Sequence, residues 1–442
     1  MKEKLALFGG EKAVQGGLER CQRPVVPDKA YKTINDMLIK GDISASPVVA
    51  RFEKKFREYI GTEYSLCYVN GTTSIQAALF AVGVGAGDEV IVPSFTFWAT
   101  VGPVAAANAI PVFADVDRDS HTLTAETIEK CITPKTKAIL LVHVWGNPCD
   151  MDPIMELAKK HNLKVIEDCS HAHGAEYKGK KVGSIGDIGC FSLQGSKVLP
   201  GGEGGIMVTN NREYFERACA LGHYERLGNL PDDSEYKKYS LTGFGFKHRI
   251  NPFAAAIAEA GLDRLDELNA IRKENGEYFD KHLAAMGHIK PLKEVEGGNR
   301  VYAYHHIEYL PEKLKGLSMH TLLEALTAEG LFTGPCGYGV LHKAPFFAAD
   351  GPYAEKCHFG CPHYGGKYAP AEYLEVSEYL NKCVIYAAPR FEYEDKTVID
   401  EYIHAHQKVI DNLDLLLKYD AEKNEKEKQL KSDGRSITTF RK

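Results

Sequence analysis

The sequence predicts an α/β fold, in which a large domain with a mostly parallel, seven-stranded sheet flanked by helices precedes a smaller C-terminal α+β domain. Three observations support this prediction. Short apolar runs alternate with helical segments between residues 65 and 210, and Gly, Pro, Asn or Asp bounds each run. After residue 265 the pattern changes to long helical stretches separated by loops rich in Gly, Pro and aromatic residues.

The expected strands are the apolar runs of the first region. In order, they span residues 66–69, 89–92, 111–114, 138–143, 164–167, 189–192 and 205–208. A ligand of a parallel α/β sheet binds beyond the carboxyl ends of its strands. The residues that follow these runs are therefore the first candidates for a binding site, and they form the segments 70–73, 94–97, 168–173 and 192–197.

We expect three units along the chain. Residues 1–268 hold an N-terminal segment and the large domain, and residues 269–420 hold the small domain. Residues 421–442 form a charged tail that is nearly free of apolar periodicity, so we expect it to be disordered. An amphipathic helix is predicted over residues 397–417, because apolar side chains recur there at helical spacing.

Composition and charge exclude several classes of protein. Hydrophobic residues make up 44% and charged residues 26% of the chain, as in globular proteins. The net charge of −6 offers no basic field for nucleic acid or an anionic membrane. No apolar run approaches the roughly 18 residues that span a bilayer, and the first is too short for a signal peptide. Since the 11 cysteines lack a disulfide-framework spacing, we expect a reduced, cytoplasmic protein.

The first candidate motif is NGTTS at residues 70–74, between an expected strand and a helix predicted over residues 72–82. A helix N-terminus carries free backbone N–H groups and a partial positive charge, and three hydroxyl groups accompany it here. The motif therefore suits an anion such as a phosphate. It also suits an ordinary helix cap, because Ser, Thr and Asn are preferred at that position in any case.

The second candidate is Asp168, a carboxylate that directly follows the apolar run 164–167. A buried carboxylate needs a cation or N–H groups as partners, and a protonated pyridine nitrogen would be one such cation. A helix-capping or salt-bridged aspartate is the alternative. His171 and His173 follow closely, although an isolated histidine is more often a structural residue than a catalytic one.

The third candidate is Lys197, on a loop that precedes the Gly-rich segment 201–205. The surrounding glycines and small polar residues do not suit an ordinary solvated lysine. Partial desolvation makes an amine nucleophilic and able to form a Schiff base with a carbonyl cofactor. Together, an anion-binding helix end, an aspartate for a pyridinium and a lysine for a Schiff base meet the requirements of pyridoxal 5′-phosphate.

With these motifs, the sequence resembles the DegT/StrS-type family of sugar and cyclitol aminotransferases, which belong to the fold-type I pyridoxal-phosphate class. The resemblance extends from residue 9 to about residue 417. Its strongest segments are NGTTSIQAAL at 70–79, VPSFTFWAT at 92–100, PVFADVD at 111–117, VHVWGNPCDMDPI at 142–154, IEDCSHAHGA at 166–175 and VGSIGDIGCFSLQGSKVLPGGEGG at 182–205. It implies an enzyme that takes an amino group from glutamate or glutamine, passes through a pyridoxamine-phosphate form, and aminates a keto-sugar or keto-cyclitol.

The resemblance also assigns catalytic roles. Lys197 would form the Schiff base and move the proton between the substrate Cα and the cofactor C4′. Asp168 would pair with the pyridine nitrogen. His171 stands where many members have Gln, near the hydroxyl face of the cofactor ring, and resembles the inosose aminotransferases and the amino-hydroxybenzoate synthases.

Further assignments concern cofactor binding. Phe97 matches the aromatic residue that stacks on the ring, and its neighbour Trp98 is the competing candidate. The residues assigned to the phosphate are Gly71, Thr72, Thr73 and Ser192. In the family, the partner subunit supplies an Asn to the phosphate from a G-x-N-Y-R segment, which reads GFKHR at 245–249 here, so that Lys247 replaces the Asn. The resemblance thus implies a homodimer with shared active sites.

Two other functions stay open. One is a lyase or aromatising enzyme of the same fold that resembles the amino-hydroxybenzoate synthases, and the other is a non-catalytic cofactor-binding regulator. The intact Lys197 and Asp168 count against a regulator, because binding alone needs neither. Relatives that dehydrate sugars have His at the Lys197 position, so the lysine favours transamination. The loop 334–368 is expected to form part of the substrate wall, because its His and Tyr residues suit hydroxyl recognition.

No metal site is expected from the sequence. Cys357, His358, Cys361 and His363 lie close together, but the Cys-x₃-Cys spacing is loose and no second pair of ligands follows.

Overall fold

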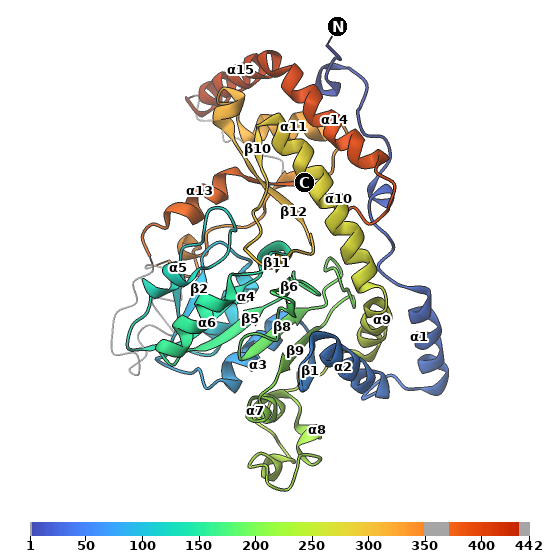
Figure 1. The fold of residues 1–442 in the computed structure, drawn as a ribbon, viewed down its shortest axis with the longest axis vertical. Coiled ribbons are helices and arrows are strands. Elements are labelled where there is room, and N and C mark those ends of the chain that lie inside the picture. Colours follow the sequence, from blue (N-terminus) through green and yellow to red (C-terminus); the bar gives the residue numbers. More distant parts are fainter. Residues whose placement is uncertain (1, 349–370, 433–442) are drawn as a thin grey trace.

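The computed structural model describes residues 2–348 and 371–432. These residues form two packed units around separate sheets (Figure 1). The seven-stranded sheet lies in the lower part of this view and the four-stranded sheet in the upper part. A small third sheet joins β6 (Glu176–Tyr177), β7 (Lys180–Lys181) and β11 (Gly298–Asn299).

The large sheet confirms all seven predicted strands, whose ends differ from the prediction by at most two residues. The strands are β1 (Tyr64–Tyr68), β2 (Glu89–Pro93), β3 (Ile110–Ala114), β4 (Thr136–Val142), β5 (Lys164–Asp168), β8 (Ile188–Ser192) and β9 (Gly205–Thr209). Their spatial order is β1-β9-β8-β5-β4-β2-β3. All neighbours are parallel except β9, which is antiparallel to both β1 and β8. The sheet is therefore mostly parallel, as predicted.

Helices cover both faces of this sheet, because successive strand residues alternate between two apolar cores. Val90 and Val92 contact the core on one face, and Ile91 contacts the core on the other. The first face carries α3 (Gly71–Ala81), α4 (Trp98–Ala106) and α7 (Arg212–Gly222). The second face carries α2 (Pro47–Ile60), α5 (Ala125–Glu129), α6 (Met151–Lys160) and α9 (Pro252–Leu262). The helix predicted over residues 72–82 is thus confirmed as α3.

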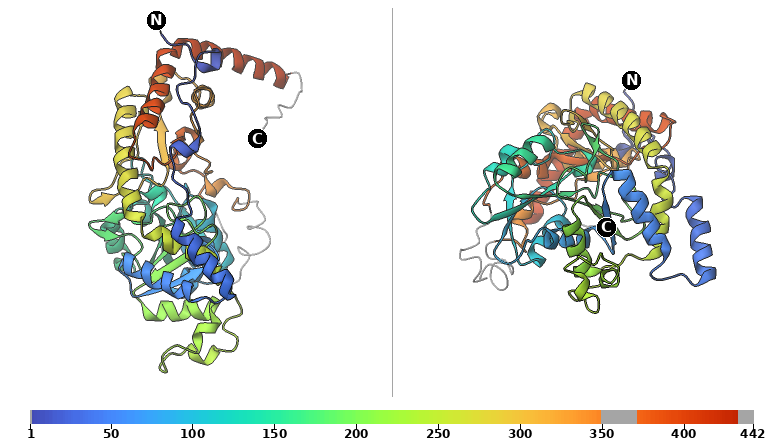
Figure 2. Two further views of the ribbon diagram at one scale, coloured as in Figure 1. Left: turned by 90° about the vertical axis from the view of Figure 1, so that its right-hand side faces the viewer. Right: turned by 60° about the horizontal axis from the view of Figure 1, so that its bottom comes forward.

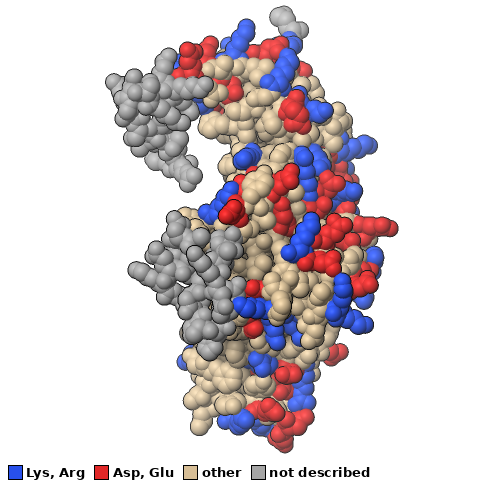
Figure 3. Space-filling view, turned by 90° about the vertical axis from the view of Figure 1, so that its left-hand side faces the viewer, with Lys and Arg blue, Asp and Glu red and all other residues tan. Residues whose placement is uncertain are grey.

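The remaining elements of this unit are peripheral. They are α1 (Asp28–Lys40), α8 (Tyr224–Leu227) and the 3-10 turn η4 (Lys237–Tyr239), whereas the 3-10 turn η3 (Val144–Gly146) is buried after β4. Acidic and basic side chains are interspersed on the face of the molecule that Figure 3 shows. Among the described helices, none combines the length and the apolar composition that crossing a membrane requires.

The upper unit is an antiparallel sheet with helices around it. Its strand order is β10 (Ile289–Lys290), β12 (His305–Tyr309), β14 (Val384–Ala388) and β13 (Gly334–Pro335). The associated helices are α11 (Met319–Ala328), α13 (Glu375–Cys383), α14 (Thr397–Asp411) and α15 (Leu413–Ser432), with the 3-10 turns η5 (Pro311–Leu314) and η6 (Leu341–Lys343). Residues of α11, β12, β14 and α14 share one apolar core.

Helix α10 (Leu265–Met286) connects the two units. Leu265 at its start packs into the core beneath α2 and α9, whereas Phe279 and Leu283 pack into the core of the upper unit. The expected boundary after residue 268 falls in the first turns of this helix and stays a prediction. The helix itself is continuous through the change of core.

The N-terminal segment differs from its expected placement with the large domain. Leu5, Val14 and Cys21 are buried in the core of the upper unit, and the segment includes the turns η1 (Ala6–Phe8) and η2 (Leu18–Arg20). The side chain of Glu329 holds it by accepting hydrogen bonds from the backbone N–H groups of Ala6 (2.8 Å) and Ala13 (3.0 Å). No pattern within the segment indicates these partners, which lie more than 300 residues away.

The C-terminal region also differs from the expectation. The helix predicted over residues 397–417 is interrupted at Asn412, whose side chain donates to the carbonyls of Glu3 (2.9 Å) and Lys408 (2.8 Å). Residues 421–432, expected to be disordered, lie in α15 at the outer end of the upper unit (Figure 2). Distant partners anchor the helix: the Tyr419 ring packs on Phe8 at 5.6 Å, and Asp420 accepts a hydrogen bond from Ser318 (2.6 Å).

Candidate active site

A cavity of about 770 Å³ opens where the parallel strands end and the upper unit begins. Its wall includes Thr96, Asp168 and Ser192, which lie at or just beyond the ends of β2, β5 and β8. Of the residues predicted for the site, Gly71, Thr72, Phe97, Asp168, His171, Ser192 and Lys197 line this cavity. Thr73 and Lys247 do not line it.

The N-terminus of α3 forms one end of the cavity. The Asn70 side chain caps the helix by accepting hydrogen bonds from the N–H (2.9 Å) and the hydroxyl (2.8 Å) of Thr73. The Thr73 hydroxyl is therefore already engaged, which explains why it does not face the cavity. A Cβ at Gly71 would lie 2.8 Å from the Ser192 Cβ, so only glycine allows the helix to start this close to β8. Backbone N–H groups and the Ser192 hydroxyl thus lie together at a site suited to an anion.

Asp168 lies at the end of β5 and is 4% exposed. One carboxylate oxygen accepts from the Thr100 hydroxyl (2.8 Å) and the other from the backbone N–H of Ser170 (3.0 Å). These bonds fix the carboxylate, and no ion pair with a described cation neutralises it. A carboxylate placed this way can hold a positively charged group of a ligand.

His171 lies on the loop after β5 and has a defined tautomer. Its Nδ1 accepts the backbone N–H of Trp145 (3.2 Å), so the proton of the neutral ring resides on Nε2, 3.3 Å from the Tyr338 hydroxyl. Burial lowers the pKa of His171 well below its ordinary value, assisted by the nearby Lys197 charge. His171 is therefore a neutral donor to Tyr338, whose own hydroxyl proton is free to point at a ligand.

His173 has a different environment. It is fully buried, and burial lowers its pKa to about 3. Its ring packs on Phe191 at 5.2 Å, and its carbonyl accepts the Asn269 amide (3.0 Å). His173 therefore lies behind the cavity rather than in it.

Lys197 is half-buried on the loop between β8 and β9. Its Nζ lies 5.9 Å from the centre of the Tyr304 ring, and no described carboxylate forms an ion pair with it. Its backbone N–H donates to the Gln194 carbonyl (2.9 Å), and the carbonyl of Ser196 accepts from Arg390 (3.0 Å). The amine is thus presented to the cavity by a loop with an ordered backbone.

The upper unit contributes a wall that sequence reasoning largely missed. It consists of Tyr304 and His306 around β12, Phe332 to Cys336 and Tyr338 around β13, and Tyr386 on β14. Tyr338 falls in the loop expected to contact substrate, but nothing near residues 304–306 or 386 marked them as site residues. Stacking holds His306 in place, since its ring lies 4.2 Å from the Trp145 ring at an angle of 10°.

The model of the DegT/DnrJ/EryC1/StrS aminotransferase family matches residues 26–359. The chain belongs to this family. The resemblance stated from the motifs is thereby confirmed, as is the prediction of aminotransferase activity, which is favoured over the lyase and regulator alternatives.

Several aminotransferases are similar to the chain. The L-glutamine:2-deoxy-scyllo-inosose aminotransferase of Streptomyces lividus is 39% identical over 334 residues, which cover 72% of this chain and 78% of the relative. The GDP-perosamine synthase of Caulobacter vibrioides is 40% identical over 263 residues, covering 59% and 69%. The crystal structure of an aminotransferase from Psychrobacter cryohalolentis superposes with a TM-score of 0.77 at 28% identity, covering 89% of this chain and 99% of that one.

Two aromatic residues of this aminotransferase compete for the ring-stacking position. Phe97 and Trp98 both line the cavity and are 46% and 57% exposed, with ring centres 5.5 Å apart. The ring centre of Phe97 also lies 6.3 Å from that of Tyr338. Stacking of Phe97 on the ring stays a prediction, with Trp98 as the competing candidate.

Lys247 is exposed outside the cavity of its own chain. Its Nζ lies 5.6 Å from the Tyr224 ring, and its backbone pairs with His223. Its predicted contact with a cofactor phosphate therefore requires a second subunit and stays a prediction.

One buried cluster has the composition of a metal site. Ligand atoms of His143, Glu167 and Cys169 lie within 4.8 Å of one another. However, Glu167 already accepts the His143 ring N–H (2.9 Å) and the backbone N–H groups of Gly183 (2.7 Å) and Gly186 (2.6 Å). Burial also raises the pKa of the Cys169 thiol well above its ordinary value. The cluster thus supports the turn before β8. Cys357, His358, Cys361 and His363, where the sequence led us to expect no metal site, lie outside the described residues.

Proposed function

We propose that this aminotransferase uses pyridoxal 5′-phosphate to move an amino group from glutamine or glutamate to the ketone of a keto-cyclitol or keto-sugar. The observation that supports this most strongly is that Lys197 and Asp168, from separate segments, line one cavity beside the N-terminus of α3. A carbonyl-reactive amine, a carboxylate for a pyridinium and an anion site are the groups that this cofactor needs.

The residues present fit the cofactor. Gly71, Thr72 and Ser192 would hold its phosphate, and Asp168 would keep its ring nitrogen protonated. Phe97 would pack against the ring, with His171 near the ring hydroxyl. When bound, the cofactor supplies the electron sink, and Lys197 would carry the proton between the substrate carbon and the cofactor.

The wall that the upper unit contributes suits a hydroxylated ring. The hydroxyls of Tyr304, Tyr338 and Tyr386 and the imidazole of His306 line it. The charged side chains among the described lining residues are Asp168, Lys197 and Glu203. The described lining therefore contains no arginine that could bind the diphosphate of a nucleotide. We therefore favour an acceptor without a nucleotide, in keeping with the cyclitol in the name of the Streptomyces lividus relative.

A donor-and-ketone screen tests the proposed function. Protein loaded with the cofactor is mixed with glutamine or glutamate, and the visible spectrum is followed until the pyridoxamine form accumulates. A keto-cyclitol, a free keto-sugar and a nucleotide-linked keto-sugar are then added separately. We expect the keto-cyclitol to restore the initial spectrum with formation of an aminocyclitol. Failure of every donor to change the spectrum would contradict the proposal.

Replacing Tyr338 with phenylalanine is expected to slow amination of the ketone by about tenfold, because an oriented hydrogen-bond donor to the acceptor is lost. The donor half-reaction should stay within about twofold of wild type. Stopped-flow absorbance measures the two halves separately. Tyr393→Phe is a matched control, since the Tyr393 hydroxyl contacts the Gln22 carbonyl (3.4 Å) instead of the cavity. An equal loss in both half-reactions would contradict an acceptor-specific role.

Mixing inactive Lys197→Ala with a crippled Lys247→Ala variant is expected to restore activity. If Lys247 serves the partner's site, each mixed dimer has one intact site, so a 1:1 mixture should approach about a quarter of wild-type activity. The physical reason is that a phosphate held only by hydroxyls and a helix end keeps most of its negative charge, which a nearby cation stabilises. Subunit exchange is verified by mass spectrometry, and exchange without recovery would place Lys247 elsewhere. The homodimer stays a prediction until this test, and the cytoplasmic location stays a prediction that this test does not address.

A further inference from the structure

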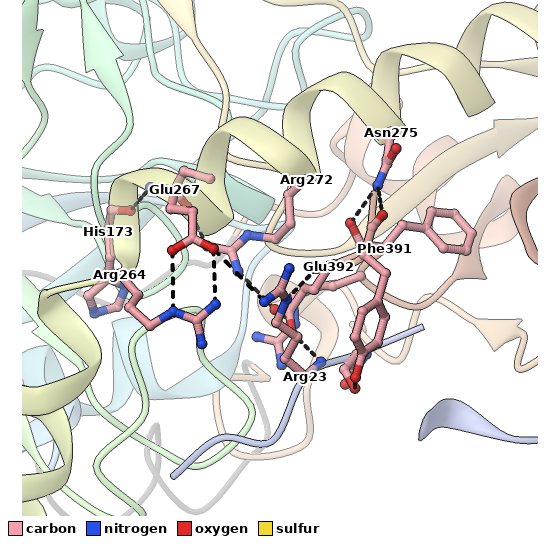
Figure 4. Close-up of polar contacts among 12 residues, drawn as sticks. Arg23, His173, Arg264, Glu267, Arg272, Asn275, Phe391 and Glu392 are labelled. Carbon is pink, nitrogen blue, oxygen red and sulfur yellow. Dashed lines mark hydrogen bonds and ion pairs between the residues drawn. The ribbon is translucent and has the colours of Figure 1, made fainter. Parts of the chain in front are cut away.

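A buried carboxylate lies where the two units and the N-terminal segment meet. The side chain of Glu392, just after β14, is 6% exposed. One of its oxygens lies 2.8 Å from the Arg272 guanidinium and 3.6 Å from that of Arg390. The other accepts the backbone N–H of Arg23 at 2.8 Å (Figure 4). The Glu392 carboxylate thus faces two buried arginines and also holds the backbone of the N-terminal segment at Arg23.

The first arginine leads to the loop after β5. Arg272 on α10 is fully buried, and its guanidinium also donates to the side-chain oxygen of Asn269. The Asn269 amide in turn donates to the carbonyl of His173 (3.0 Å). His173 belongs to the short loop that follows Asp168 and carries His171.

The second arginine leads to the lysine loop. Arg390 is 6% exposed, and its Nη1 donates to the carbonyl of Ser196 (3.0 Å), the residue before Lys197. The Tyr304 hydroxyl reaches the same carbonyl at 3.3 Å. The peptide bond that precedes the candidate catalytic lysine is therefore held from the upper unit.

Electrostatics explains why these contacts depend on Glu392. An arginine without exposure to water is unfavourable unless an anion faces it. Burial lowers the pKa of Arg272 to about 10, and Glu392 opposes this shift. No other described carboxylate forms an ion pair with Arg272 or lies beside Arg390. Loss of its charge would leave two close guanidinium groups repelling each other.

We propose that Glu392 is a positioning residue that acts through Arg390 and Arg272 on the two loops carrying Lys197 and His171. It also ties these loops to the N-terminal segment, since its carbonyl accepts the Arg23 Nε (2.8 Å) and its N–H donates to the Cys21 carbonyl (2.7 Å). The catalytic consequence rests on the proposed function, but the effect on the loops does not.

Hydrogen exchange on the full-length protein tests the effect on the loops. In Glu392→Gln, which keeps the shape and removes the charge, we expect amide exchange in residues 169–175 and 193–199 to accelerate at least fivefold. Glu392→Asp keeps the charge and should recover part of the protection. Glu274→Gln is the matched control, because Glu274 lies on the same helix, α10, and pairs with Lys396 at 2.6 Å on the surface, away from Arg23, Arg272 and Arg390.

A second variant separates the two arms. Arg390→Gln should accelerate exchange in residues 193–199 and leave residues 169–175 unchanged, and it keeps the test decisive if Glu392→Gln does not fold. In the aminotransferase assay, Glu392→Gln should lower kcat at least tenfold while the donor KM stays within threefold. Unchanged exchange in both loops, or equal acceleration of both in Arg390→Gln, would overturn the proposal. A protein without transaminase activity that still shows these exchange changes would contradict the proposed function alone.

Discussion

Lys197→Ala is expected to abolish amino-group transfer, with a loss of at least about a thousandfold, or ~4 kcal/mol of barrier. The substitution removes both the amine that binds the cofactor covalently and the base that moves the proton. No described side chain of the cavity can replace it, because Lys197 is the only lysine among the described lining residues. The cavity and the Asp168 contacts should remain intact, so the variant should still bind the cofactor noncovalently.

Two measurements check this prediction. Turnover is assayed with the donor and ketone found in the screen, and the absorbance of the lysine-bound cofactor is recorded. Borohydride reduction of the wild-type protein, followed by digestion and mass spectrometry, should find the cofactor on a peptide that contains Lys197. Lys180→Ala, at an exposed position in β7, is the control and should behave as wild type. Attachment of the cofactor to a different lysine would refute the assignment.

Asp168→Asn is expected to lower the rate by at least about tenfold, or ~1.4 kcal/mol. Asparagine preserves the size of the side chain and can still accept the Thr100 hydroxyl, which lies 2.8 Å from the carboxylate. It removes the negative charge that would keep a pyridine nitrogen protonated, so the cofactor becomes a poorer electron sink. Cofactor affinity should fall less than the rate does.

Steady-state kinetics and a cofactor titration measure these two effects on the same preparation. Thr100→Val serves as a comparison, because it removes one hydrogen bond to Asp168 without changing the charge, and its effect should be smaller. Near-normal turnover of Asp168→Asn would show that Asp168 has only a structural role. If Asp168→Asn lost folding stability in proportion to its loss of rate, the same conclusion would follow.

Much of the large domain could be predicted from the sequence. Each strand of the seven-stranded sheet is a contiguous apolar run between turn residues, so a local pattern is sufficient to find it. The site residues Asp168, Ser192 and Lys197 follow such runs, and the parallel arrangement brings strand ends to one edge. Antiparallel β9 could not be predicted this way, since an apolar run carries no information about its direction.

The sequence by itself thus determined the fold class, the strands and the residues at the strand ends, because each of these is encoded within a short stretch of chain. Only the tertiary structure decided which other residues join the site. Tyr304, just before β12, and Tyr386 on β14 reach the cavity from the upper unit. Glu392 contacts Arg272 and Arg23 across 120 and 369 residues of sequence. Such contacts depend on how two separate cores pack together, and no local periodicity records that packing.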